Sequence, residues 1–170
     1  GSRHMTRVCR IDSRSLWLAT LIYLALPVAI FAVGWLKLPF ALVLLAALTV
    51  GIFFNGKHHE ESPVSVPLWG LLVLSASCVA LCILAGVGGF AYQDGDYSKH
   101  NSILTDLFRR EWPVAYSLEQ NGATHPVALV YYIAYYLPPA CIGKFAGWEA
   151  LRCAMVLWTA CGLFIVSIWC

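Results

Sequence analysis

The side chains best suited to chemistry gather in one polar segment, residues 93–119. Its first part places Asp94, Asp96, Lys99 and His100 within seven consecutive residues. Two carboxylates at this spacing can supply a general base for a substrate hydroxyl, or can ligate a divalent cation. Asp94 and Asp96 are therefore candidate catalytic residues, and their simpler interpretation is solvated loop charge. No metal ligand is assigned, although a divalent cation is one option for a cofactor.

Four basic side chains of the same segment are candidate substrate-binding residues: Lys99, His100, Arg109 and Arg110. A guanidinium can pair with two oxygens of a phosphate, and a lysine binds phosphate as a point charge. Each residue also has a simpler interpretation. Arg109 and Arg110 could be general anchors to lipid headgroups, whereas Lys99 and His100 could be solvated, as most loop charges are.

The elements that must position these residues are strongly apolar. Of the 170 residues, 60% are hydrophobic and 12% are charged, which excludes a disordered chain and is atypical of a water-soluble protein. The net charge of +2 excludes a nucleic-acid binder that relies on a basic surface. Asp, Glu, Lys and Arg are absent from five stretches, at 15–36, 38–54, 62–93, 120–143 and 153–170. Each stretch is long enough to cross a bilayer core of about 30 Å as a helix.

The predicted fold is therefore an all-α, polytopic membrane helix bundle with five spans. They lie at about 16–36, 38–54, 67–90, 126–142 and 148–170, and one long outer loop covers 91–125. Gly86, Gly88 and Gly89 would loosen the end of the third span. Pro138-Pro139 would bend the fourth span or end it early.

The two ends of the chain carry separate signals. Residues 1–4 resemble a tag remnant before Met5, which leaves 5–170 as a single transmembrane domain. The last apolar stretch runs to Cys170 without a polar tail. This ending favours the N-terminal part of a longer protein.

A short helix is expected inside the long loop. Ile103, Leu104, Leu107 and Phe108 recur at helical spacing, with Asp106 elsewhere on the turn. This pattern predicts a helix that lies in the membrane interface with its apolar face toward the lipid. Such a helix would hold the preceding carboxylates at the depth of lipid phosphates.

Basic residues predict the orientation of the bundle. With the N-terminus inside, six native Lys and Arg residues fall on the inner side and four on the outer side. Lys144 and Arg152 belong to the inner six in this five-span map, and Arg7, Arg10 and Arg14 directly precede the first span. The expectation is an integral protein of a plasma or inner membrane, with a cytoplasmic N-terminus and an extracytoplasmic loop.

Three other clusters are weaker candidates for function. The His-His-Glu-Glu run at residues 58–61 is interpreted as a solvated loop rather than a metal site. Cys78 and Cys82 share a helix face and are expected to be packing residues. A tyrosine stripe in the fourth predicted span fits either helix packing or a sugar platform; it consists of Tyr131, Tyr132, Tyr135 and Tyr136.

The loop resembles the membrane-embedded GT-C glycosyltransferases. Gly95-Asp96-Tyr97 is similar to a motif of the dolichyl-phosphate-glucose-dependent glucosyltransferases, and Asp94-Gly95-Asp96-Tyr97 is similar to the Asp-x-Asp-Tyr of the glycosylphosphatidylinositol mannosyltransferases. The resemblance covers this loop alone. The superfamily usually places the loop after its first span and needs more than five helices, whereas two additional spans precede the loop here.

The resemblance implies transfer of a sugar from a polyprenyl-phosphate carrier to an acceptor on the outer side. Asp96 would then deprotonate or orient the acceptor hydroxyl, and Asp94 would assist or help to bind a metal. The implied partners are membrane lipids, a polyprenyl-phosphate-linked sugar and a missing C-terminal part of the same protein. On this interpretation the 170-residue chain by itself is inactive.

Two alternatives from other functional classes remain. The chain could be a transporter fragment, although ion coupling usually needs ionisable groups within the spans, and the five uncharged stretches contain no Asp, Glu, Lys or Arg. It could also be a non-catalytic membrane assembly subunit, which would explain its short length. Replacement of Asp96 by Asn separates these classes, because only an enzyme should lose transfer.

Overall fold

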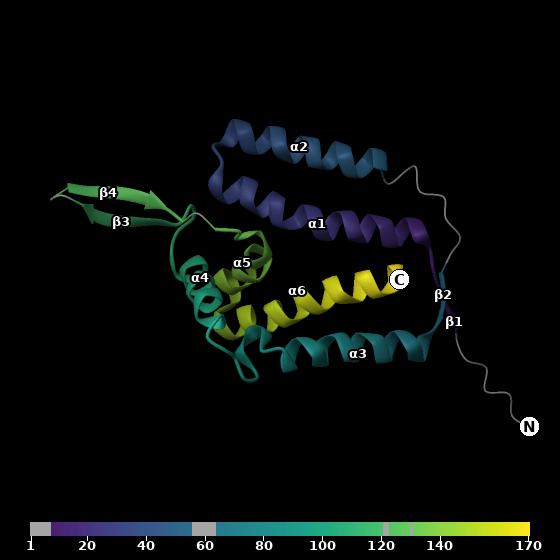
Figure 1. The fold of residues 1–170 in the computed structure, drawn as a ribbon. Helices are drawn as coiled ribbons and strands as arrows, with labels where there is room; N and C mark the ends of the chain where they lie inside the picture. Colours follow the sequence, from purple (N-terminus) through teal and green to yellow (C-terminus); the bar gives the residue numbers. More distant parts are fainter. Residues whose placement is uncertain (1–7, 56–63, 121–122, 130) are drawn as a thin grey trace, which may run out of the picture.

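The computed structural model describes residues 8–55, 64–120, 123–129 and 131–170. Within them, four long helices run side by side with alternating direction: α1 (Ser13–Trp35), α2 (Leu38–Asn55), α3 (Leu68–Leu84) and α6 (Trp148–Trp169). Their spatial order is α2, α1, α6, α3 (Figure 1). α1, α2 and α6 are long and apolar enough to span a membrane, and α3 is a shorter apolar helix of 17 residues. These helices are compatible with an integral membrane protein and agree with the predicted spans at 16–36, 38–54 and 148–170.

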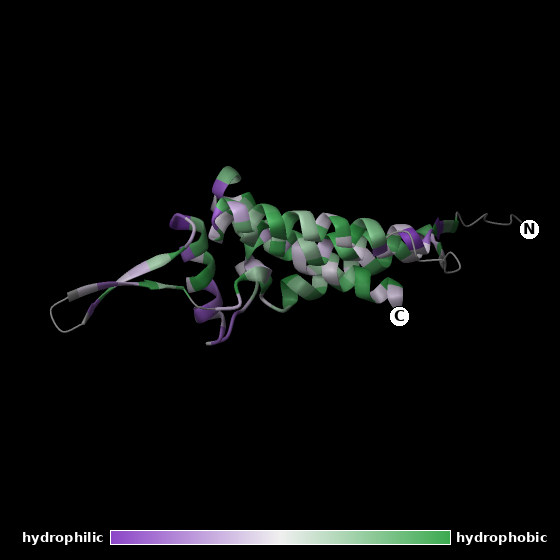
Figure 2. Cartoon of the chain, turned by 90° about the horizontal axis from the view of Figure 1, so that it is seen from above, coloured by the Kyte–Doolittle hydropathy of each residue, from purple (hydrophilic) through white to green (hydrophobic). Residues whose placement is uncertain are grey.

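Local sequence explains where α1 begins and ends. The Asp12 carboxylate accepts a hydrogen bond from the Ser15 backbone N–H at 3.3 Å, which satisfies one of the unpaired donors of the first turn. The helix ends at Trp35, and Lys37 opens the tight turn into α2. Apolar residues cover the length of the bundle, while hydrophilic residues concentrate toward its two ends (Figure 2).

The predicted span at 126–142 is wrong. Its residues divide among strand β4 (Ala123–Ala128), the 3₁₀ turn η2 (Ala134–Tyr136) and the helix α5 (Leu137–Ala146). α5 has 10 residues and is therefore about 15 Å long, half of a bilayer core. Pro138 and Pro139 begin this helix rather than end one, because the first helical turn lacks intrahelical partners for its N–H groups.

Two antiparallel strand pairs were not predicted, and one of them is a hairpin. β1 (Val8–Ile11) pairs with β2 (Val64–Pro67) at one end of the bundle, and β3 (Ala115–Gln120) pairs with β4 at the other. The β3–β4 hairpin projects well beyond the helices (Figure 1). The fold is therefore predominantly helical, as expected, with two small sheets at opposite ends.

The loop helix exists as α4 (Tyr97–Arg109), but its surroundings differ from the prediction. Ile103, Leu104 and Leu107 are buried in a core cluster with Leu137 of α5 and Leu151 of α6. Other parts of the protein thus cover the apolar face that was expected to face lipid. α4 is an integral wall of the fold at this end.

Because the fourth predicted span is absent, two basic residues lie at the other end of the bundle from the end that was predicted. Lys144 of α5 contacts α4, and Arg152 of α6 contacts the segment that follows α3, so both lie at the same end as Asp96. The five-span map had put them at the N-terminal end. The six-to-four count therefore becomes four to six, and the total number of basic residues no longer supports a cytoplasmic N-terminus.

Candidate functional site

A cavity of about 370 Å³ lies at the α4 end of the bundle. It is bounded by the turn after α3, by α4, by η2 and by the first turns of α6. The polar and aromatic side chains of its lining come from all four parts: Gln93, Asp94, Asp96, Tyr97, His100, Asn101, Tyr135, Tyr136, Trp148 and Arg152.

A glycine turn forms the floor between α3 and the two carboxylates. Gly86, Gly88 and Gly89 adopt φ angles of +83°, +75° and +72°, in the left-handed region that favours glycine. A Cβ on Gly86 would lie 2.8 Å from the Tyr92 carbonyl oxygen, so the turn also requires close backbone contact. The predicted loosening of this helix end is confirmed, since α3 ends at Leu84.

Three side chains hold the segment around Asp94 against this turn. Gln93 Nε2 donates to the Gly86 carbonyl oxygen at 2.7 Å, and Asn101 Nδ2 of α4 donates to Gln93 Oε1 at 2.8 Å. The Tyr97 hydroxyl donates to the carbonyl oxygen of Ala85. The start of α4 is thereby tied to the end of α3, with the carboxylates between them.

Asp94 and Asp96 both line the cavity and lie at its solvent-exposed side. The Asp96 backbone N–H donates to Asp94 Oδ1 at 3.2 Å, which fixes the spacing of the two residues. Asp96 also forms a loose ion pair with Lys99, at 3.8 Å between Nζ and Oδ1, and both side chains are mostly exposed. An exposed pair of this kind is weak, so Asp96 stays available to a substrate proton.

Arg152 contributes the positive charge of the cavity. Its Nε donates to the Gly88 carbonyl oxygen at 2.7 Å, and its Nη2 donates to that of Gly89 at 2.9 Å. Nη1 donates to the Glu149 carboxylate at 2.9 Å. These contacts leave at least one of its five N–H groups for a ligand. Sequence reasoning missed Arg152 because the erroneous fourth span placed it on the other side.

His100, in the first turn of α4, also lines the cavity. Its Nδ1 is hydrogen-bonded to the hydroxyl of Tyr136 in η2, and its ring meets that of Tyr97 edge-on, at 5.9 Å between centroids. Tyr136 is only 3% exposed. Burial, followed by the influence of neighbouring tyrosines, raises the pKa of Tyr136 to about 12, so its hydroxyl stays protonated at neutral pH.

The remaining predicted binding residues lie outside this cavity lining. Lys99 reaches it only through its ion pair with Asp96, and Arg109 is exposed at the C-terminal end of α4. Arg110 Nε donates to Asp106 Oδ1 at 3.0 Å, and its guanidinium stacks over the Tyr116 ring at 4.8 Å. The structure thus brings Asp94, Asp96 and His100 together and leaves these three basic residues apart.

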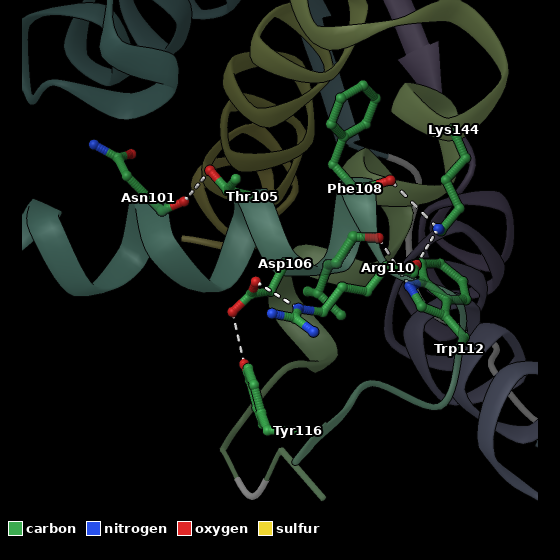
Figure 3. A network of polar contacts seen from close by, with 9 residues as sticks. Asn101, Thr105, Asp106, Phe108, Arg110, Trp112, Tyr116 and Lys144 are labelled. Carbon is green, nitrogen blue, oxygen red and sulfur yellow. Dashed lines mark hydrogen bonds and ion pairs between the residues drawn. The ribbon is translucent and has the colours of Figure 1, made fainter. Parts of the chain in front are cut away.

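Arg110 belongs instead to a network that joins α4 to its neighbours (Figure 3). The Tyr116 hydroxyl of β3 donates to Asp106 Oδ2 at 2.6 Å. Lys144 Nζ donates to the Arg110 carbonyl oxygen at 2.6 Å and lies over the Trp112 ring at 5.1 Å. A cation beside these carbonyls suits the negative end of the α4 dipole. The network fixes the wall of the cavity rather than its chemistry.

The other sequence candidates have separate outcomes. Tyr135 and Tyr136 line the cavity, whereas Tyr131 and Tyr132 stack on each other at 3.9 Å, so the four do not form a helical stripe. Cys78 and Cys82 are buried against α6, as expected of packing residues. The run at 58–61 lies outside the described residues.

Within the described ranges, no three His, Cys, Asp or Glu residues gather as a metal site. Asp94 and Asp96 could still hold Mg²⁺ together with oxygens of a bound phosphate, because Mg²⁺ commonly takes one or two carboxylates plus substrate phosphates. The donor set therefore fits a cation that arrives with its ligand.

Comparison of the chain with protein-family models, with curated proteins and with solved structures yields no match. A functional assignment therefore depends on the geometry of the cavity and on the residues that line it.

Proposed function

We propose that this chain carries the catalytic edge of a GT-C-type membrane glycosyltransferase, which transfers a sugar from a polyprenyl-phosphate donor to an acceptor on the extracytoplasmic face. One observation carries the proposal. Asp94 and Asp96 share a cavity with His100 and Arg152 at the end of long apolar helices. A lipid-linked donor would keep its tail beside those helices, so its phosphate and anomeric carbon would arrive at this depth.

The proposed chemistry assigns the base to Asp96. Its carboxylate takes the proton of the acceptor hydroxyl while the acceptor oxygen attacks the anomeric carbon. The bond between that carbon and the phosphate oxygen breaks, and polyprenyl phosphate leaves with the bonding electrons. Arg152 offers positive charge to the leaving phosphate, and Asp94, held to the Asp96 backbone at 3.2 Å, positions the base.

The proposed orientation places the cavity outside the cytoplasm. Arg7 and Arg10 before α1 and Arg14 in its first turn support this orientation, because charges next to the first span usually dominate. The four-to-six count of basic residues works in the opposite direction. Labelling from each side of the membrane therefore decides the orientation.

The test is sugar release by the intact gene product in liposomes, with a panel of polyprenyl-phosphate sugars as donors. We expect release from at least one hexosyl or pentosyl donor, and a loss of about a hundredfold or more for Asp96→Asn. Glu119→Gln on the exposed hairpin serves as the matched carboxylate control and should keep full activity.

The alternative outcomes are equally specific. Release that is indifferent to Asp96→Asn would remove the aspartate from the mechanism. Folded protein that releases sugar from no donor would contradict the transferase and would favour a membrane assembly subunit.

A further inference from the structure

His100 and Tyr136 form a hydrogen-bonded pair that has no assigned role in the proposed glycosyl transfer. The two residues come from different elements, α4 and η2, and their side chains form a hydrogen bond between Nδ1 and the hydroxyl. In the neutral ring of a histidine only one nitrogen carries a proton. The direction of this bond therefore decides which nitrogen of His100 is the donor toward the cavity.

The surroundings of Tyr136 fix that direction. Its side chain is 3% exposed, and His100 Nδ1 is the acceptor that the described residues offer to its hydroxyl. If Nδ1 carried the proton, no described residue would accept the proton of this largely buried hydroxyl, which is unfavourable. The hydroxyl must therefore donate, and Nδ1 must accept.

The consequence falls on the other nitrogen. A neutral His100 that accepts at Nδ1 carries its proton on Nε2, and no described residue bonds to Nε2. In this tautomer His100 presents a hydrogen-bond donor, Nε2–H, rather than an acceptor.

The charges of the cavity indicate which ligand atom this N–H would meet. The carboxylates of Asp94 and Asp96 are exposed, whereas His100 of α4 and Arg152 of α6 are half-buried parts of the same lining. An anion would be repelled by the exposed carboxylates and attracted by the two half-buried donors. Oxygens of a phosphoryl group are strong acceptors for both of them.

We propose that His100 is held by Tyr136 as the neutral Nε2–H tautomer and that this N–H, together with Arg152, binds a phosphoryl oxygen in the cavity. This inference deepens the proposed function. The phosphoryl ligand rests on the proposed function, whereas the tautomer of His100 is independent of it. Tyr136 is then a positioning residue that acts through His100.

The first test is nitrogen-15 NMR of the full chain in detergent, with labelled histidine. At pH 8 we expect a His100 signal with an unprotonated Nδ1 and a protonated Nε2. His100→Phe/Tyr136→Phe identifies the signal by its loss, because replacing both partners by apolar rings of similar shape leaves no buried group unpaired. Tyr136→Phe alone should give a mixture of tautomers. A protonated Nδ1 in the unchanged protein would overturn the proposal.

The second test adds farnesyl phosphate, inorganic phosphate or farnesol to the labelled chain. Farnesyl phosphate should shift the His100 Nε2 signal, and the double variant should bind it about tenfold more weakly. A further shift with inorganic phosphate would indicate that the phosphoryl group suffices, whereas none would indicate that the lipid tail is also needed. The matched control is His125→Gln on the exposed strand β4, which should bind normally.

An absent shift, or an equal shift with farnesol, would overturn the phosphoryl site. These outcomes are independent of sugar release. A phosphate-induced shift in a protein that transfers no sugar would retain the site and reject the transferase, whereas transfer with a protonated Nδ1 would do the reverse.

Discussion

Arg152 in α6 donates its Nε proton to the carbonyl oxygen of Gly88, 64 residues earlier in the chain, at 2.7 Å. The two residues also limit each other sterically, because a Cβ on Gly88 would lie 2.7 Å from the Arg152 carbonyl oxygen. The glycine turn and the start of α6 therefore depend on one another. Since Asp94 and Asp96 follow this turn, the same contact sets where the carboxylates lie.

Gly88→Ala should displace the turn. The residue has a φ of +75°, where an L side chain costs about 1–3 kcal/mol, and its Cβ would meet backbone rather than a flexible side chain. We expect a lower unfolding temperature in detergent and a loss of sugar release. Gly51→Ala in α2, where a Cβ meets nothing within 4 Å, should leave both unchanged. Equal behaviour of the two variants would contradict the mutual dependence.

Arg152→Lys should weaken the cavity even though it keeps the charge. A lysine cannot reach two carbonyl oxygens with one planar fork, so the contacts to Gly88 and Gly89 would not both survive. We expect reduced thermal stability and at least tenfold less sugar release. Glu149→Gln is the matched control, because its carboxylate is 73% exposed and such pairs contribute about 0–1 kcal/mol. If Arg152→Lys behaved like the wild type, only the positive charge of Arg152 would matter, and its hydrogen bonds to the glycine turn would not.

The arrangement of the helices predicts that both ends of the described chain lie on one side of the membrane. Cys9 in β1 and Cys170 after α6 lie at the end of the bundle opposite α4 (Figure 1). In single-cysteine variants, an impermeant maleimide should therefore label both from the same side. It should label Ser117→Cys on the exposed strand β3 from the other side. Labelling of Cys9 and Cys170 from opposite sides would restore an odd number of crossings.

The same experiment in vesicles of known sidedness measures the orientation. We expect Cys9 to be labelled from the cytoplasmic side, because Arg7 and Arg10 precede α1 and Arg14 lies in its first turn. The reverse result would place the cavity in the cytoplasm and would exclude the proposed extracytoplasmic transfer.

Asp106 should make the attachment of the hairpin pH-dependent. Burial raises the pKa of Asp106, but hydrogen bonds from Tyr116 and Arg110 outweigh this effect and lower the pKa below its usual 3.8. The ionised carboxylate therefore stabilises the fold above that usual value, and the stabilisation is lost as the pH falls through the folded pKa.

Unfolding temperatures between pH 3 and 6, measured for Asp106→Asn and for the unchanged protein, test this sign. The variant should be less stable by about 1 kcal/mol at pH 6, and the difference should shrink toward pH 3. Glu119→Gln, on the exposed part of β3, should show no such convergence. A constant difference across the range would contradict the assigned role of the carboxylate.

The length of the uncharged stretches predicted α1, α2 and α6 well, because a long apolar stretch without charges usually forms a membrane-spanning helix. The same criterion was wrong at 126–142, where residues are uncharged because they build a hairpin and a cavity wall. Asn121-Gly122 is a typical hairpin turn sequence and could have revealed β3 and β4. Pro138-Pro139 can either begin a helix or end one, and the surrounding structure decides between the two.

The candidate site divides in the same way. Asp94, Asp96 and His100 could be found from their spacing, because they follow one another along a single segment. Arg152 and Tyr136 could not, since their relation to that segment depends on which way α6 runs and on where η2 folds. Contacts between residues so far apart in sequence require the tertiary fold.

α2 differs from the other long helices in how little of the protein it touches. Ala41 is its one buried residue, and its packing partner among the helices is α1. Selection on α2 should therefore act on side-chain hydrophobicity rather than on residue identity. One hydrophobic residue should replace another at most of its positions. In a saturation mutagenesis library, hydrophobic substitutions in α2 should have little effect on folding except at Ala41.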